Sequence, residues 1–326
     1  MVEPGAGCLI AMPPSNPSPP PPPASAPVKD TAGSGRWREF FFGERGLPRL
    51  FFYLPLGFMV LFLVVPMALT LVWSVFPRDR FWMKPGFTLV AYEKFFDSGR
   101  IDTFIASIYH SGISVVVAFV IGFPIAVFVR RRIPLRAQHA VMLLFILPFM
   151  VSELIRTFAL RPVLGRTGLV NNTLVNLGII SEPISIILSS PLATIIGEVM
   201  SFLPFLIFAS FLAMEAVERY VFEVCDDLGS RGFNLFKDIL IPLAAPGIFA
   251  GSLFIFVNGI GLYIIPFLLG GPAAANAGVI VTNAIGGLDY PLAMAISVIM
   301  MTLMIGLLYL GHRLFDLTRI LEPIRR

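Results

Sequence analysis

Six long apolar stretches, separated by polar segments, constrain this chain more than any other feature. Each is long enough to cross a hydrocarbon core of about 30 Å as a helix. The chain is 56% hydrophobic and 13% charged, with a mean hydropathy of +0.84, and a soluble domain could not bury that much apolar surface. We therefore expect an all-α membrane protein with six transmembrane helices in contact with membrane lipid. The predicted spans are Leu50–Phe76, Phe104–Val129, Gln138–Leu160, Leu192–Met214, Ala245–Leu269 and Pro291–Leu314.

The placement of basic residues predicts the orientation of these spans. If the N-terminus is inside, the inner segments hold most of the 24 lysines and arginines, and cytoplasmic loops are the ones enriched in such residues. Both termini are therefore expected in the cytoplasm, and the basic excess needs no nucleic acid to explain it. The inner residues are Lys29, Arg36, Arg38, Arg45, Arg49, Arg130, Arg131, Arg132, Arg136, Arg219, Arg231, Lys237, Arg313, Arg319, Arg325 and Arg326.

Composition divides the chain into three parts. Residues 1–49 form a tail rich in Pro, Ser, Ala and Gly as far as Gly35, followed by a basic and aromatic segment, Arg36–Arg49, that is typical of a cytoplasmic membrane interface. The tail is expected to be disordered, because such a composition cannot bury a core. Residues 50–314 form the transmembrane domain, and residues 315–326 a basic cytoplasmic C-terminus.

One loop between spans, Glu215–Pro246, does not have the pattern of a simple connection. Its first part, Glu218–Leu228, has mixed charge and an apolar side, and Gly229 interrupts it. A second short helix is expected at Asn234–Leu240, before Pro242. Two short helices with apolar sides suit docking into a groove on a soluble partner.

This spacing resembles the EAA loop of ABC-importer permeases. Glu223 precedes Gly229 by six residues, and Ile239-Leu240-Ile241-Pro242 follows, although Val224 and Cys225 stand where the family has alanines. Three further segments resemble the polyamine and opine branch of these permeases: Leu147–Ala159, Ser201–Phe208 and Pro242–Val257. The residues that would correspond to the ATPase-coupling positions are Glu223, Asp227, Gly229, Phe233, Phe236 and Pro242.

The resemblance implies a type I ABC-importer permease fold in a bacterial inner (plasma) membrane. It also implies an assembly with a dimer of ABC ATPases, a second homologous permease and a periplasmic solute-binding protein. The loop would form coupling helices that sit in a cleft of the ATPase. No G-x-x-x-x-G-K-[ST] motif occurs in the chain, so we expect no enzyme and no cofactor here, with ATP and Mg²⁺ bound by the partner ATPase.

Ionisable residues inside the spans predict the substrate pathway, because each is costly in lipid and must face protein or water. Glu153 and Glu198 each lie about five residues outward of the centre of their spans, hence at one depth. With nearby aromatic and amide groups they would form a ring that attracts a cationic amine. These neighbours are Tyr109, Tyr263 and Asn258.

Alternatives remain open for these positions. Glu153 could be structural and pair with Arg156, three residues on, while Arg156 could instead hold a gate or an anionic group of the solute. The spans also carry an apolar pair followed by Pro-Phe three times, at Pro148, Pro204 and Pro266. A proline within a span kinks the helix.

The expected function is that of a permease subunit working by alternating access, with a polyamine or another small organic cation as solute. An opine or amino-acid-derived solute is the first alternative. A secondary transporter driven by an ion gradient would explain the carboxylates but not the loop, and an intramembrane enzyme lacks a nucleophile or metal constellation.

Overall fold

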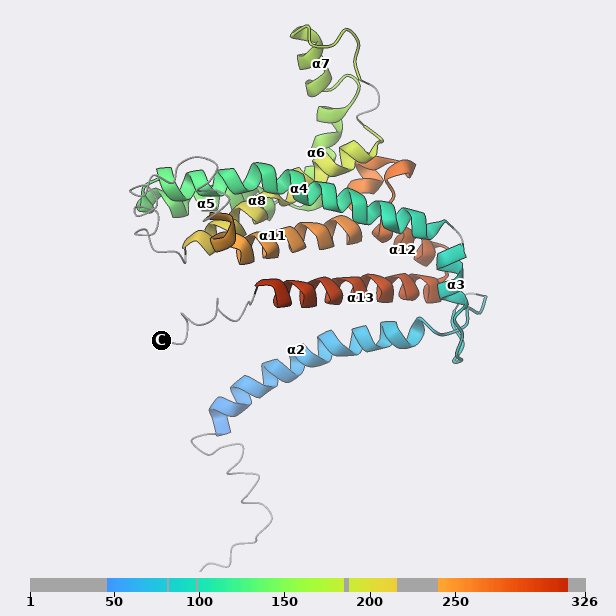
Figure 1. Cartoon of the computed structure of the whole chain (residues 1–326). Coiled ribbons are helices and arrows are strands. Elements are labelled where there is room, and N and C mark those ends of the chain that lie inside the picture. The colour runs from blue at the N-terminus through green and yellow to red at the C-terminus, as the bar shows by residue number, and fades with distance from the viewer. Residues whose placement is uncertain (1–45, 81, 98, 185–187, 216–239, 316–326) are drawn as a thin grey trace, which may run out of the picture. The chain divides into compact units, whose positions relative to one another are not determined.

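The computed structural model describes residues 46–315, apart from residues 81, 98, 185–187 and 216–239. The regular elements within these residues are helices (Figure 1). The longer helices are α2 (Gly46–Trp73), α4 (Arg100–Arg132), α5 (Leu135–Met150), α8 (Pro191–Glu215), α11 (Ile241–Gly261) and α13 (Tyr290–Phe315). The shorter ones are α3 (Val90–Asp97), α6 (Glu153–Leu164), α7 (Leu169–Asn176), α12 (Ala277–Gly286), a π-helical turn (Pro266–Gly270) and a 3₁₀ turn (Pro272–Ala274).

The predicted spans are confirmed as apolar helices, with corrections to the third and the fifth. Five described helices are long and apolar enough to cross a membrane, and α5 with α6 makes a sixth only as a bent pair. The expected straight span Gln138–Leu160 is wrong in this respect, because the chain leaves the helix at Val151 and turns by 87° into the segment Glu153–Asn176, which begins with α6. Pro148 lacks an N–H and so weakens the last turn of α5, and Val151 and Ser152 are extended at ψ 138° and 134°.

The fifth span also ends earlier than expected. Helix α11 stops at Gly261, and Leu262 and Tyr263 are non-helical before the turn at Pro266. The buried side chain of Asn276 compensates for the break, because its Nδ2 donates to the carbonyls of Gly259 and Leu262 at 2.8 and 2.9 Å. By contrast, Pro204 lies inside α8, which is continuous.

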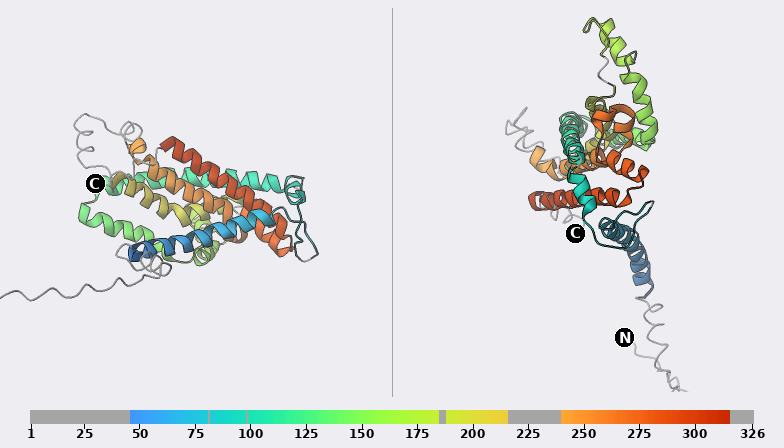
Figure 2. Two further views of the ribbon diagram at one scale, coloured as in Figure 1. Left: turned by 90° about the horizontal axis from the view of Figure 1, so that it is seen from below. Right: turned by 90° about the vertical axis from the view of Figure 1, so that its right-hand side faces the viewer.

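Helices α4, α8 and α11 pack side by side and form the core that carries the site (Figures 1 and 2). Small residues allow α8 and α11 to approach closely. A Cβ on Gly247 would lie 2.5 Å from the Cβ of Ala213, and a Cβ on Gly251 would lie 2.7 Å from Leu206 Cδ1. The spacing Gly247-x-x-x-Gly251 is the small-residue pattern that brings membrane helices together.

Helix α2 contains the boundary between two compact units of the chain. The boundary lies between Leu63 and Val64. The helix has 28 residues, and its described side chains are mostly apolar and exposed. At about 1.5 Å per residue it is long enough to cross a bilayer. In the remainder of the chain, α13 packs against α12 and α3 around Phe95, Leu292 and Ile296.

Candidate functional site

Glu198 lies where α4, α8 and α11 meet, and it is only 2% exposed. Its Oε2 accepts a 2.6 Å hydrogen bond from the hydroxyl of Ser114 on α4, which also lies within hydrogen-bonding distance of the His110 carbonyl. A Cβ on Gly259 of α11 would lie 3.0 Å from the same Oε2 and 2.5 Å from Ser111 Oγ. Glu198 is therefore enclosed by helix packing, and its partner comes from another helix.

Glu153 and Arg156 lie in the first turn of α6, directly after the break. In the part of the chain that the structure describes, no ion pair joins them. Arg156 Nη1 donates instead to the backbone carbonyl of Ser201 at 2.8 Å, and the guanidinium carbon lies 5.5 Å from the centre of the Phe149 ring. Glu153 Oε1 and Arg156 Nε are buried without hydrogen-bond partners. The structure thus shows a contact between α6 and α8, and not the pair that the sequence offered as an alternative.

The other residues of the expected ring are dispersed. Asn258 follows the aromatic Phe254 by one helical turn on α11, and its Nδ2 donates to the Phe254 carbonyl at 2.7 Å. Tyr263 lies in the break after α11 and is 44% exposed. Tyr109 is 66% exposed, on the side of α4 away from the buried Ser111 and Ser114. Asn258 therefore bonds within its own helix, and Tyr109 lies on another side of α4 from the serine that contacts Glu198.

An aromatic cluster next to Arg156 was not predicted from the sequence. Phe205 of α8 and Phe254 of α11 stack with ring centres 3.9 Å apart and an angle of 27°. Phe149 of α5 lies 6.3 Å from Phe205 and 6.1 Å from Phe254. All three rings are only partly buried. The repeated Pro-Phe pairs in the sequence could have indicated this cluster, because two of the three phenylalanines, Phe149 and Phe205, belong to it. The third, Phe267, is 70% exposed.

The expected ATPase-coupling residues lie mainly outside the described part of the chain: Glu223, Asp227, Gly229, Phe233 and Phe236. Pro242 is described and is the second residue of α11. Where the chain enters this loop, Arg130 Nε donates to the Met214 carbonyl at 3.2 Å, and His139 Nε2 lies 3.4 Å from Glu215 Oε1. The end of α8 is therefore tied to α4 and α5.

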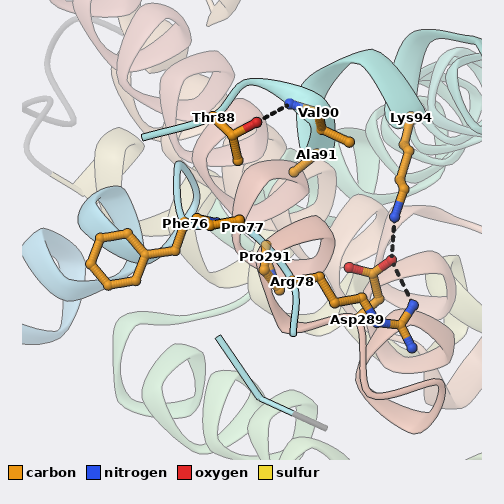
Figure 3. Close-up of a pocket in the computed structure, with 9 residues that line it drawn as sticks. All are labelled: Phe76, Pro77, Arg78, Thr88, Val90, Ala91, Lys94, Asp289 and Pro291. Carbon is orange, nitrogen blue, oxygen red and sulfur yellow. Dashed lines mark hydrogen bonds and ion pairs between the residues drawn. The ribbon is translucent and has the colours of Figure 1, made fainter. Parts of the chain in front are cut away.

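At the other end of the core, an ionic cluster joins three segments. Asp289 Oδ2 lies 3.1 Å from Arg78 Nη1 and 3.2 Å from Lys94 Nζ, and its side chain is 12% exposed. Figure 3 shows this carboxylate between the two cations. They line a pocket of about 280 Å³ formed by the segment after α2, α3 and the turn before α13.

We expect Asp289→Asn to destabilise the protein by about 1–2 kcal/mol, because two cations would then face a neutral group. Thermal unfolding of the detergent-solubilised protein measures this. Asp79→Asn is the matched control, since its 3.0 Å pair with Lys84 is exposed at both side chains (44% and 69%) and should leave the unfolding temperature unchanged. Equal shifts in the two variants would contradict the structural role of Asp289.

The chain is similar in sequence to bacterial permeases. The spermidine/putrescine transport system permease protein PotB of Haemophilus influenzae is 33% identical over 214 residues, which cover 64% of this chain and 74% of that protein. PotB of Escherichia coli K12 is 32% identical over 235 residues, 72% of this chain and 84% of that protein. The inner membrane ABC transporter permease protein YdcU of Escherichia coli K12 is 27% identical, covering 74% of this chain and 81% of that protein. No family model matches the chain.

The fold is shared with solved structures. A chain of a bacterial ABC transporter involved in the import of the acidic polysaccharide alginate superposes with a TM-score of 0.65 at 18% identity, covering 86% of this chain and 99% of that chain. A second structure, of a bacterial alginate ABC transporter in complex with an alginate pentasaccharide-bound periplasmic protein, gives a TM-score of 0.67 at 17% identity, covering 87% and 98%.

The helical architecture and this likeness give the chain the type I ABC-importer permease fold. The sequence comparison is more specific: the chain belongs to the family of spermidine/putrescine transport system permease proteins. It is a multi-pass inner-membrane permease subunit of an ABC importer, and its relatives are permeases and not ATPases.

Proposed function

We propose that this permease moves a polyamine, or another small organic cation, across the inner membrane. The observation that carries this proposal is the 32–33% identity to permeases named for spermidine and putrescine, over about three quarters or more of their length. The buried Glu198 and the partly buried Glu153, whose Oε1 is enclosed, are consistent with it, because acidic groups within membrane helices attract cations.

Transport would be driven from outside this chain. A dimer of ABC ATPases binds and hydrolyses ATP with Mg²⁺, and this chain contributes no catalytic residue of its own. The segment Glu223–Pro242 docks into the ATPases and transmits their closure to the spans, as the EAA-like spacing suggests. A second homologous permease and a periplasmic solute-binding protein complete the assembly. With both termini cytoplasmic, the loop faces the ATPases, which agrees with the excess of arginine on that side.

The test is solute-stimulated ATP hydrolysis by the complex reconstituted with its partner subunits in liposomes. We expect stimulation by spermidine or putrescine. Arginine and octopine serve as comparison solutes, because each carries a carboxylate and they represent the amino-acid-derived alternative. That alternative is favoured by one observation, the Arg156 guanidinium beside the aromatic cluster. Stimulation by octopine or arginine alone would overturn the polyamine assignment while leaving the permease class intact.

Glu198→Gln should weaken the response to spermidine without unfolding the protein. The glutamine keeps an oxygen that accepts from Ser114, so the 2.6 Å contact can persist while the negative charge is lost. Because a charge acts over several ångströms within a protein, we expect the half-saturating spermidine concentration to rise by about threefold to tenfold. Octopine or arginine stimulation would change less. An unchanged spermidine response would assign Glu198 to helix packing alone.

A further inference from the structure

The break between α5 and α6 places irregular backbone within a predicted membrane span. Val151 and Ser152 are exposed in this chain, and α5 is bent by 87° from the segment Glu153–Asn176 that follows. Non-helical backbone at membrane depth is tolerated only where protein or water covers it, and interrupted helices often border binding sites in transporters. The partly buried rings of Phe149, Phe205 and Phe254 lie beside this break, on three different helices.

Arg156 contacts this cluster in an arrangement that leaves other polar atoms unmatched. Its guanidinium carbon lies 5.5 Å from the Phe149 ring centre, and Nη1 reaches the Ser201 carbonyl. Meanwhile Arg156 Nε and Glu153 Oε1 are buried without partners, which is unfavourable for each group. Residues three apart on a helix can pair, so Glu153 offers Arg156 a second position within reach.

We propose that the cluster of Phe149, Phe205 and Phe254 is a binding subsite for the alkylammonium group of the solute, and that Arg156 holds it until the solute arrives. The incoming ammonium replaces the guanidinium at the Phe149 ring, and Arg156 moves to Glu153. The two charges of α6 then neutralise each other, so the arginine no longer repels the bound cation. This inference rests on the proposed transport of an organic cation.

In this proposal Arg156 and the solute compete for the Phe149 ring, and this competition decides whether each substitution raises or lowers the half-saturating spermidine concentration. A cation over an aromatic ring gains about 0.5–2 kcal/mol, which corresponds to about 2- to 30-fold in binding. Arg156→Gln removes the competing cation, so the half-saturating spermidine concentration should fall by a factor in that range. Phe149→Leu in the Arg156→Gln background removes the ring, so the concentration should rise again by a similar factor.

The experiment measures spermidine-stimulated ATP hydrolysis by the reconstituted complex for a double-mutant cycle of Arg156→Gln and Phe149→Leu. The effect of Phe149→Leu should be larger in the Arg156→Gln background than with Arg156 present, because the native ring is already occupied. Phe149→Trp should retain the wild-type concentration, since it keeps an aromatic face. Phe158→Leu is the control, because this ring on α6 is 50% exposed and has no ring contact among the described residues.

Three outcomes separate the possibilities. A higher spermidine requirement in Arg156→Gln would show that the arginine assists binding and would overturn the competition. Equal effects of Phe149→Leu in both backgrounds, or failure of Phe149→Trp to substitute, would assign the ring to packing only. If the wild-type complex responds to no polyamine, the proposed function fails, and this differs from failure of the subsite because wild type and control then show no spermidine response at all.

Discussion

Gly247→Val is expected to prevent α8 and α11 from packing and to leave little folded protein. A Cβ at this position meets the carbonyl oxygen of Ala209 and lies 2.5 Å from the Cβ of Ala213. The oxygen belongs to the backbone, so no rotamer change can relieve the contact, and the two helices must separate. Overpacking typically lowers the free energy of unfolding by about 1–3 kcal/mol. Here it also separates α8 from α11, which pack closely in the core, so we expect a loss of more than about 3 kcal/mol.

The measurement is the yield of monodisperse protein in size-exclusion chromatography in detergent, together with the unfolding temperature. Gly306→Val provides a matched control, because Gly306 lies within α13 and a Cβ there has nothing within 4 Å. Both variants introduce the same β-branched residue into a helix, so the difference between them isolates the contact with α8. Similar behaviour of the two variants would mean that α8 and α11 do not approach closely at Gly247.

The sequence was sufficient for the straight spans because their signal is local. Helix α8 was expected at Leu192–Met214 and runs over Pro191–Glu215, and α13 was expected at Pro291–Leu314 and runs over Tyr290–Phe315. A helix in lipid needs about 20 apolar residues, and length and hydropathy alone supply that information. The break after α5 was not predicted, because Val151 and Ser152 do not lower the hydropathy enough to mark it. A proline alone does not show whether a helix bends or ends, since α8 is continuous around Pro204.

Counting residues along a span predicts a depth for each candidate site residue but not the side of the helix on which it lies. Counting residues placed Tyr109 and Glu198 at one level, yet depth does not state which side of a helix a residue occupies. Tyr109 is two residues before Ser111, and successive positions are about 100° apart, so the tyrosine lies on the exposed side while the serine is buried. The partner of Glu198 is Ser114, 84 residues earlier in the chain, and no local pattern identifies a contact over that separation. Whether Glu198, Glu153, Asn258 or Tyr263 contacts the solute stays a prediction.

Asn276→Asp should be among the most damaging substitutions of a single functional group in this chain. The residue is 4% exposed. Its Oδ1 accepts from the Val279 N–H at 3.0 Å and begins α12, while its Nδ2 donates to two carbonyls at the broken end of α11. Aspartate keeps the first bond but turns a carboxylate oxygen toward the carbonyls of Gly259 and Leu262. Because those acceptors lose their donor and face a buried charge, we expect a loss of more than about 3 kcal/mol.

The comparison of Asn276→Asp with Asn276→Ala and Asn172→Asp locates the cause. Asn276→Ala loses the same bonds without adding a charge, so its unfolding temperature should lie between that of the wild type and that of Asn276→Asp. Asn172 is exposed in the first turn of α7 and donates one bond to the Thr167 carbonyl at 3.1 Å, so Asn172→Asp should change stability by less than about 0.5 kcal/mol. An unfolding temperature for Asn276→Asp equal to that of wild type would mean that other groups hold the end of α11. Gly259, on that segment, lies against Ser111 and Glu198, so in that case the packing of Gly259, and not the hydrogen bonds of Asn276, would fix the end of α11 next to the Glu198 carboxylate.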